Sequence, residues 1–162
     1  IRDRAQPLNV ETIFHVLSEA SLKSVAAGRA SSSVGILLFK FANYKCIAGS
    51  NTDDEIIQLA IKMIQEKSPE FLLMQLLDVD DAGHKNGLLS QEFAKAMSDI
   101  DQHLGALFPY LAAAGYGLMV LADHGAHQVE GRATHDGTSE DDLIVPLTWC
   151  SSDYLREIYD LN

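Results

Sequence analysis

The sequence is poor in cysteine, in cations and in long apolar runs, and these shortages limit what the protein can be. Its two cysteines, Cys46 and Cys150, are far apart and show no CxxC spacing, so two free buried thiols are expected, with a disulfide between them left open. Twelve Lys and Arg against 23 Asp and Glu give a net charge of −11, which argues against a basic clamp for duplex nucleic acid. The longest apolar runs reach about eight residues, too few to span a bilayer.

What remains is the composition of one globular domain. The 162 residues are 47% hydrophobic and 22% charged, enough to bury a sizeable core, and they show no internal repeat or low-complexity segment. The opening "IRDRAQPLNVETIFHVL" has no initiator Met and no signal peptide, and it runs almost directly into a helix. We therefore expect residues 1–162 to be one domain, the C-terminal part of a larger catalytic domain, and soluble, with the cytoplasm favoured.

Strand and helix patterns alternate along the chain. Apolar residues at helical spacing and capping residues predict helices from Asn9 or Glu11 to about residue 22 and over residues 52–67, 90–115 and 152–159. Continuous apolar runs predict buried strands over residues 24–28, 71–79, 116–125 and 143–149. Residues 31–44 suit either state, with helix favoured. This alternation predicts an α/β fold with three layers, α/β/α, around a mostly parallel sheet.

Polar residues follow two of these predicted strands. The segment "DVDDAGHKNG" (78–87) places Asp80 and His84 four residues apart, and we expect a turn there in which Gly83 bends the backbone. Asp123 and His124 follow the next predicted strand. Ligand sites of parallel sheets lie at the carboxyl ends of the strands, so these side chains are expected to converge at one edge.

The residue types at this edge are those of a metal site. Asp80, His84, Asp123 and His124 are joined by His135, in "THDG", as candidate ligands. Carboxylate oxygen and imidazole nitrogen are the ligands of catalytic zinc and manganese sites. A divalent cation would also offset the repulsion among clustered carboxylates.

Other polar residues admit simpler interpretations. His127 could support a metal ligand or contact the substrate, or it could lie in a solvated loop. Asp136 could orient an imidazole or be solvated. Asp81 either points away from the cluster or exchanges roles with Asp80. The "SEDD" segment (139–142) is interpreted as a solvated acidic turn. Structural roles are expected for the remaining candidates, which are His15, His103, Asp99 and Asp101.

Three segments together resemble the alkaline phosphatase superfamily. "DVDDAGHKNG", "VLADHGAH" and "THDGTSEDDLIVPL" occur in the order and approximate spacing of that superfamily, closest to its type I phosphodiesterase/nucleotide pyrophosphatase and phosphoglycerate-mutase-like branches. The segment "ETIFHVLSEASLKSVAAG" resembles the helix and strand that follow the nucleophile. The resemblance implies that Asp80, His84 and His135 hold one metal ion, whereas Asp123 and His124 belong to a second.

The resemblance also implies metal-binding and catalytic residues that this sequence does not contain at the matching positions. The second ion of the superfamily takes a further Asp and a Ser or Thr nucleophile from upstream of these motifs. Thr12, the serines at 31–33 and the pair Thr138-Ser139 all stand at the wrong places relative to the motifs. The nucleophile is therefore not expected in this chain, and the chain alone is expected to be inactive.

The function implied is that of a metal-dependent phosphohydrolase or phosphodiesterase. Two divalent ions, zinc first and manganese as the alternative, would act on a small phosphate ester or a nucleotide, through a covalent phospho-Thr or phospho-Ser. No nucleic-acid duplex and no membrane span are expected. A sulfatase or phosphomutase of the same superfamily, and a non-catalytic metal-binding module, are the alternatives.

Overall fold

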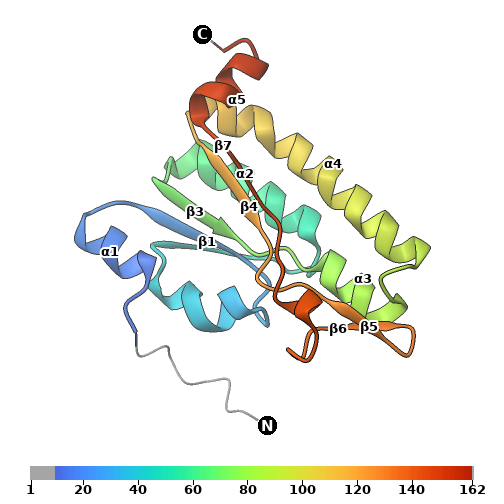
Figure 1. Ribbon diagram of the computed structural model, residues 1–162. Helices are drawn as coiled ribbons and strands as arrows, with labels where there is room; N and C mark the ends of the chain where they lie inside the picture. The colour runs from blue at the N-terminus through green and yellow to red at the C-terminus, as the bar shows by residue number, and fades with distance from the viewer. Residues whose placement is uncertain (1–9, 162) are drawn as a thin grey trace. The chain divides into compact units, whose positions relative to one another are not determined.

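The computed structural model describes residues 10–161 (Figure 1). They divide into two compact units, and the boundary in the sequence falls between Leu76 and Leu77. Unit 1 contains α1 (Ile13–Glu19), β1 (Ser24–Gly28), the π-helix η1 (Val34–Leu38), the 3₁₀ helix η2 (Phe39–Phe41), β2 (Tyr44–Ile47), α2 (Asp53–Lys67) and β3 (Phe71–Met74). Unit 2 contains α3 (Asp78–Asn86), α4 (Gln91–Ala114), β4 (Leu118–Leu121), β5 (His127–Val129), β6 (Arg132–Thr134), the 3₁₀ helix η3 (Glu140–Asp142), β7 (Leu147–Cys150) and α5 (Ser152–Ile158).

Unit 1 is a parallel sheet, in the order β2-β1-β3, with helices on both faces. All five residues of the central strand β1 are buried. Because successive side chains of a strand point to opposite faces, Ala26 packs with Phe14 of α1 on one face, whereas Val25 and Ala27 pack with Ile56 of α2 on the other. The predicted α/β fold, with a parallel sheet flanked by helices, is confirmed.

Most predicted elements of unit 1 are present. The strand at 24–28 and the helix that follows Thr52 are confirmed, and the Thr52 side chain accepts a hydrogen bond from the Glu55 backbone N–H. The first helix is shorter than predicted, Ile13–Glu19, and Asn9 lies outside the described residues. The preference for helix within residues 31–44 is confirmed by η1 and η2. Strand β2 was missed, because only Cys46 among its four residues is buried and the run carries no clear pattern.

Unit 2 is built around the long helix α4. Its predicted limits are confirmed: the Ser90 side chain accepts a hydrogen bond from the Phe93 N–H, and Gly115 ends the helix with a φ of 75°. The predicted closing helix is also confirmed, as α5.

The strands predicted over residues 116–125 and 143–149 are present in shorter form, as β4 and β7, which pair antiparallel and not in parallel. The prediction that they are buried was wrong, because half of β4 and most of β7 are exposed. An unpredicted hairpin, β5–β6, turns at Glu130 and Gly131, both at positive φ.

The prediction for residues 71–87 was wrong in two respects. The strand ends at Met74, three residues before the helix cap Leu77, and residues 78–86 are one α-helix in place of a turn. The three aspartates of "DVDDAGHKNG" lie in the first turn of α3, where the positive end of the helix dipole stabilises carboxylates. Gly83 does not bend the chain: a Cβ there would lie 3.2 Å from the Ala133 Cβ and 3.4 Å from the Phe93 ring, so its small size allows close packing.

Two further expectations concern the cysteines and the membrane. Cys46 and Cys150 are both free thiols, Cys46 buried and Cys150 half-buried. Burial raises the pKa of the Cys46 thiol above its ordinary value. Within residues 10–161, none of the helices is both long enough and apolar enough to cross a membrane.

Candidate metal centre

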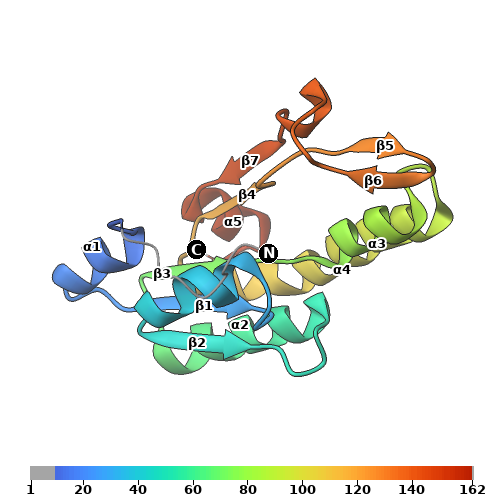
Figure 2. The ribbon, with the colours of Figure 1, turned by 90° about the horizontal axis from the view of Figure 1, so that it is seen from below.

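Three parts of unit 2 carry the predicted metal ligands. Helix α3 carries Asp80 and His84, the loop after β4 carries Asp123 and His124, and the segment after β6 carries His135. Asp80 and His84 face the same side of α3 because residues four apart on a helix are neighbours. Helix α3 packs against β6, which brings this face to the segment that begins after Thr134 (Figure 2).

Asp80, His84 and His135 present three ligand atoms at short distances from one another. The Nε2 atoms of His84 and His135 are 2.9 Å apart. The Asp80 Oδ1 atom lies 3.4 Å from Nε2 of His84 and 3.8 Å from Nε2 of His135. A point equidistant from all three lies about 2 Å from each, the length of zinc–nitrogen and zinc–oxygen bonds. The three atoms are therefore spaced as the ligands of one small divalent ion.

Two of the histidines, His84 and His124, are oriented by hydrogen bonds from their Nδ1 atoms to backbone carbonyls. A backbone carbonyl only accepts hydrogen bonds, so the Nδ1 of His84, 2.8 Å from the Ala133 oxygen, carries a proton and donates it. The Nδ1 of His124 likewise donates to the Gly125 oxygen at 2.9 Å. In each neutral ring the lone pair then resides on Nε2. Metal-binding histidines are oriented by this kind of hydrogen bond.

Asp123 and His124 lie beside the first three ligands. The His124 ring stacks on the His135 ring, with centroids 3.6 Å apart and planes 17° from parallel. Ligand atoms of Asp80, His124 and His135 all lie within 4.8 Å of one another. The Asp123 Oδ1 is 3.7 Å from the His124 Nε2, and the Asp123 side chain is 67% exposed, so this end of the cluster is open to solvent.

A second group of histidine and aspartate lies in the same unit. Ligand-type atoms of His127, Asp136 and Asp142 are within 4.8 Å of one another. The His127 Nδ1 is bonded to the Asp142 Oδ1 at 2.7 Å, and the Gly137 N–H donates to the Asp142 Oδ2 at 2.8 Å. The hydrogen bond to Asp142 raises the pKa of His127, and the same bond lowers the pKa of Asp142. His127 is thus paired and not a solvated loop residue.

Asp142 corrects the interpretation of "SEDD" as a solvated turn. Its side chain is 3% exposed, whereas Glu140 and Asp141 are exposed. The burial was missed because three successive acidic residues carry no pattern that singles one out. Asp136 accepts a hydrogen bond from the Thr138 backbone N–H, and hydrogen bonds from Thr138 lower the pKa of Asp136.

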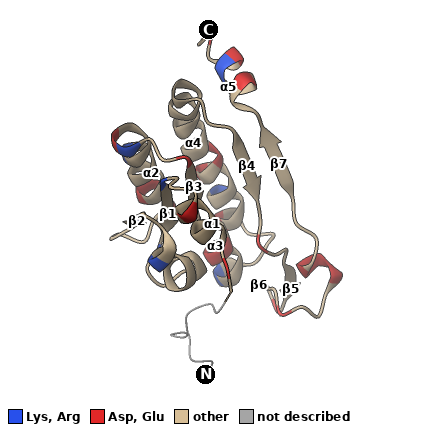
Figure 3. Ribbon diagram, turned by 90° about the vertical axis from the view of Figure 1, so that its left-hand side faces the viewer, with Lys and Arg blue, Asp and Glu red and all other residues tan. Residues whose placement is uncertain are grey.

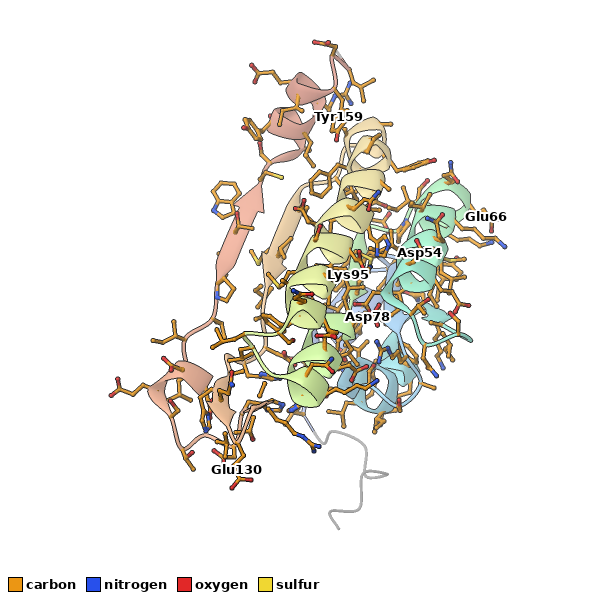
Figure 4. All side chains as sticks on the ribbon, turned by 90° about the vertical axis from the view of Figure 1, so that its right-hand side faces the viewer. Asp54, Glu66, Asp78, Lys95, Glu130 and Tyr159 are labelled. Carbon is orange, nitrogen blue, oxygen red and sulfur yellow. The ribbon has the colours of Figure 1, made fainter. Side chains whose placement is uncertain are left out.

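The other polar residues considered in the sequence are not among the candidate metal ligands. His15 accepts a hydrogen bond from the Thr12 backbone N–H at 3.1 Å, which fixes the start of α1. Asp99 forms an ion pair with Lys95 one turn earlier on α4, where Figure 4 labels Lys95. His103 is half-buried on α4, and no partner for its buried Nδ1 is found among the described residues. Asp81 is exposed on α3.

Acidic side chains predominate around the cluster. Figure 3 shows aspartate and glutamate on α3 and in the segment between β6 and β7. Charge of this sign attracts cations and repels phosphate. A phosphorylated ligand at this surface would therefore need a cation between itself and the carboxylates.

Comparison with known proteins identifies the family of the chain. Residues 11–146 match the family model described as "Type I phosphodiesterase / nucleotide pyrophosphatase". The chain belongs to this family, within the alkaline phosphatase superfamily. The family consists of metal-dependent phosphoesterases.

Two curated relatives match over part of the chain. The 2,3-bisphosphoglycerate-independent phosphoglycerate mutase of Haloquadratum walsbyi is 27% identical over 104 residues, 64% of this chain and 20% of the relative. Ectonucleotide pyrophosphatase/phosphodiesterase family member 1 of Mus musculus is 32% identical over 92 residues, 52% of this chain and 10% of the relative. The chain thus spans a fifth or less of the length of these relatives.

Solved structures share the fold. Murine ectonucleotide pyrophosphatase/phosphodiesterase 5 matches with a TM-score of 0.57 and 26% identity, over 73% of this chain and 33% of that protein, and a structure of its inactive form with AMP matches equally. The C-terminal periplasmic domain of EcEptC from Escherichia coli matches with a TM-score of 0.65 and 12% identity, over 94% and 54% of the two chains. Its complex with Zn has a TM-score of 0.59 at 14% identity, over 94% and 55%.

Proposed function

We propose that the chain is the metal-binding C-terminal part of a phosphodiesterase or phosphatase domain that hydrolyses nucleotides or other small phosphate esters. Asp80, His84 and His135 would hold one divalent ion, and Asp123 and His124 would contribute to a second. The observation that carries the proposal is the spacing of the Asp80, His84 and His135 ligand atoms, 2.9 to 3.8 Å apart.

Zinc is the proposed ion, with manganese as the alternative. Two imidazole nitrogens and a carboxylate oxygen form a ligand set of catalytic zinc sites, which leave a further position open. Partly exposed side chains at Asp80, His84 and His135 leave room for such a position. The Zn complex of the EcEptC domain supports the choice at the level of a shared fold.

In this proposal the residues of the chain bind the metal ions and orient the ligand atoms, and none of them acts as the nucleophile. The bound ions would polarise the phosphoryl oxygens and offset their charge. The hydrogen bonds from Nδ1 of His84 and His124 to backbone carbonyls fix the orientation of both rings, so that their Nε2 atoms would serve as the ligand atoms. The nucleophile would come from residues upstream of the family match, which begins at residue 11. Nucleotide substrates are proposed because AMP is bound in the related murine phosphodiesterase.

The proposal is tested by comparing this chain with a longer form of the protein that includes upstream residues. Both are loaded with zinc or manganese and given p-nitrophenyl phosphate and bis-p-nitrophenyl phosphate. We expect the 162-residue chain to bind metal without turnover, because loss of alignment alone costs about 100-fold in rate. We expect the longer form to hydrolyse at least one of the two esters.

Two results would contradict this proposal. Metal-dependent hydrolysis by the 162-residue chain, abolished by His135→Ala, would mean that the site is complete without upstream residues. A longer form that binds metal but turns over neither these esters nor nucleotide substrates would favour a non-catalytic metal-binding module.

A further inference from the structure

Asp142 is bonded to three separate segments of unit 2. Its two carboxylate oxygens accept hydrogen bonds from the His127 ring, at 2.7 Å, and from the Gly137 backbone N–H, at 2.8 Å. Its backbone oxygen accepts a hydrogen bond from the Gly125 N–H at 2.8 Å. One residue at the end of η3 thus connects the loop after β4, the start of β5 and the segment after β6.

Two of these segments carry candidate metal ligands. Gly125 directly follows His124, and Gly137 lies two residues after His135. The rings of these two histidines are stacked 3.6 Å apart, although they are eleven positions apart in the sequence. The hydrogen bonds of Asp142 therefore connect the backbone segment that carries His124 with the one that carries His135.

Gly125 shows how closely these segments approach. A Cβ at residue 125 would lie 1.9 Å from the Asp141 backbone oxygen and 2.7 Å from the Ile144 oxygen. Only glycine allows residues 141–144 to rest against the loop that carries His124. The contact that Asp142 makes there is thus part of a close backbone approach and not an isolated hydrogen bond.

Burial separates Asp142 from its acidic neighbours. Asp142 is 4% exposed, whereas Asp141 is exposed. Burying a carboxylate is costly unless it is paired and hydrogen-bonded, and Asp142 has both kinds of partner. Because its two oxygens accept hydrogen bonds from His127 and Gly137, the Asp142 carboxylate is engaged within the protein.

We propose that Asp142 is a positioning residue that holds His124 and His135 in register for metal binding. The expected effect on metal affinity rests on the proposed metal site. The positioning role itself rests on the hydrogen bonds of Asp142. A carboxylate that orients ligand-bearing segments is expected to change metal affinity by about 10-fold or more when it is lost.

The test compares Asp142→Asn with Asp141→Asn in the full 162-residue chain. Both variants remove one negative charge, from adjacent positions, and only Asp142 is buried. Zinc affinity is measured by competition with a chromophoric chelator, and the ring C–H signals of His124 and His135 are recorded by NMR without metal. We expect Asp142→Asn to weaken zinc binding about 10-fold and to shift both ring signals, since stacked rings report on their mutual position. Asp141→Asn should change neither.

The outcomes separate this inference from the proposed function. If the unaltered chain binds no zinc, the metal site fails, and the metal-free ring signals alone decide the role of Asp142. If Asp142→Asn matches Asp141→Asn in both zinc affinity and ring signals, the positioning role is overturned, even when the variant melts at a lower temperature. Should Asp142→Asn not fold, His127→Gln is used in its place, because it removes the ring hydrogen bond that holds the buried Asp142 carboxylate in position. The same shifts in the two ring signals are expected, and their absence would overturn the proposal.

Discussion

Two groups of histidine and aspartate lie in unit 2, and they use their polar atoms differently. In the first, Asp80, His84 and His135 direct Oδ1 and two Nε2 atoms at one another, with side chains 32 to 41% exposed. In the second, the Asp142 carboxylate is buried and bonded to His127 and to the Gly137 backbone. The first group brings three ligand-type atoms together at a partly exposed point, whereas the second engages both oxygens of a buried carboxylate in hydrogen bonds.

The difference shows that residue type alone does not identify a metal site. Both groups combine imidazole and carboxylate within a few ångströms of one another. What distinguishes them is burial and the engagement of the carboxylate: Asp142 is buried with both oxygens hydrogen-bonded, whereas the three side chains of the first group are partly exposed. Backbone carbonyls that accept from Nδ1 of His84 and His124 leave Nε2 available, while the Nδ1 of His127 faces a carboxylate.

The largest effect is expected from removing a ligand of the first group. His84→Ala should weaken zinc binding by about 10-fold or more, because losing a ligand should cost at least what losing its supporting hydrogen bond costs. His103→Ala is the matched control, since His103 lies on α4 and its buried Nδ1 has no hydrogen-bond partner among the described residues. Zinc affinity is measured for both variants by titration. Equal losses of affinity would mean that the cluster is not the binding site.

The residues of the first group could be predicted from the sequence, but their local structure could not. Asp80 and His84 were identified by their spacing, and that spacing holds in a turn as well as in a helix. The helix was missed because Gly83 was interpreted as a bend, when its role is to admit Ala133 and Phe93. Metal binding by these residues remains a prediction.

The second group and the hairpin beside it were beyond sequence reasoning. His127 and Asp142 are fifteen residues apart, and nothing in the run "SEDD" shows which carboxylate is buried. The turn has glycine at the second of its two residues, Glu130 and Gly131, which is typical of two-residue hairpin turns. The hairpin was missed because its two strands have only three residues each, too few to show an alternating pattern. Long elements such as α2 and α4 were predictable because their apolar spacing repeats over several turns.

An intermediate effect is expected from Gly87→Ala, which acts on the first group through the backbone. Gly87 has φ of 86° and ψ of 158°, and a Cβ there would lie 2.3 Å from the Gly131 oxygen in the turn of the hairpin. A residue with a side chain is strained in this region by about 1–3 kcal/mol. The free energy of unfolding, measured with urea, should fall by that amount.

The same variant separates the two groups. Gly87 joins the end of α3 to the β5–β6 turn, at whose tip Figure 4 labels Glu130. His84 lies on α3, three residues before Gly87, whereas His127 lies at the end of β5 away from the turn and is bonded to Asp142. Zinc affinity should therefore fall while the ring signals of His127 shift less than those of His84. A shift of His127 equal to that of His84 would show that the groups are not independent.

The smallest effect is expected in the titration of His127, followed by NMR in the metal-free chain. The hydrogen bond from His127 to Asp142 raises the pKa of His127, so its stabilisation is complete below about pH 6.5 and is lost as pH rises through the raised pKa. The pKa of Asp142 is lowered, so its share is present above about pH 4 and is lost as pH falls through the lowered value. Asp142→Asn should return the pKa of His127 toward its ordinary value. Asp141→Asn should lower it less, because Asp141 acts on His127 through charge alone. Equal pKa values for His127 in the two variants would contradict the pairing that distinguishes the second group.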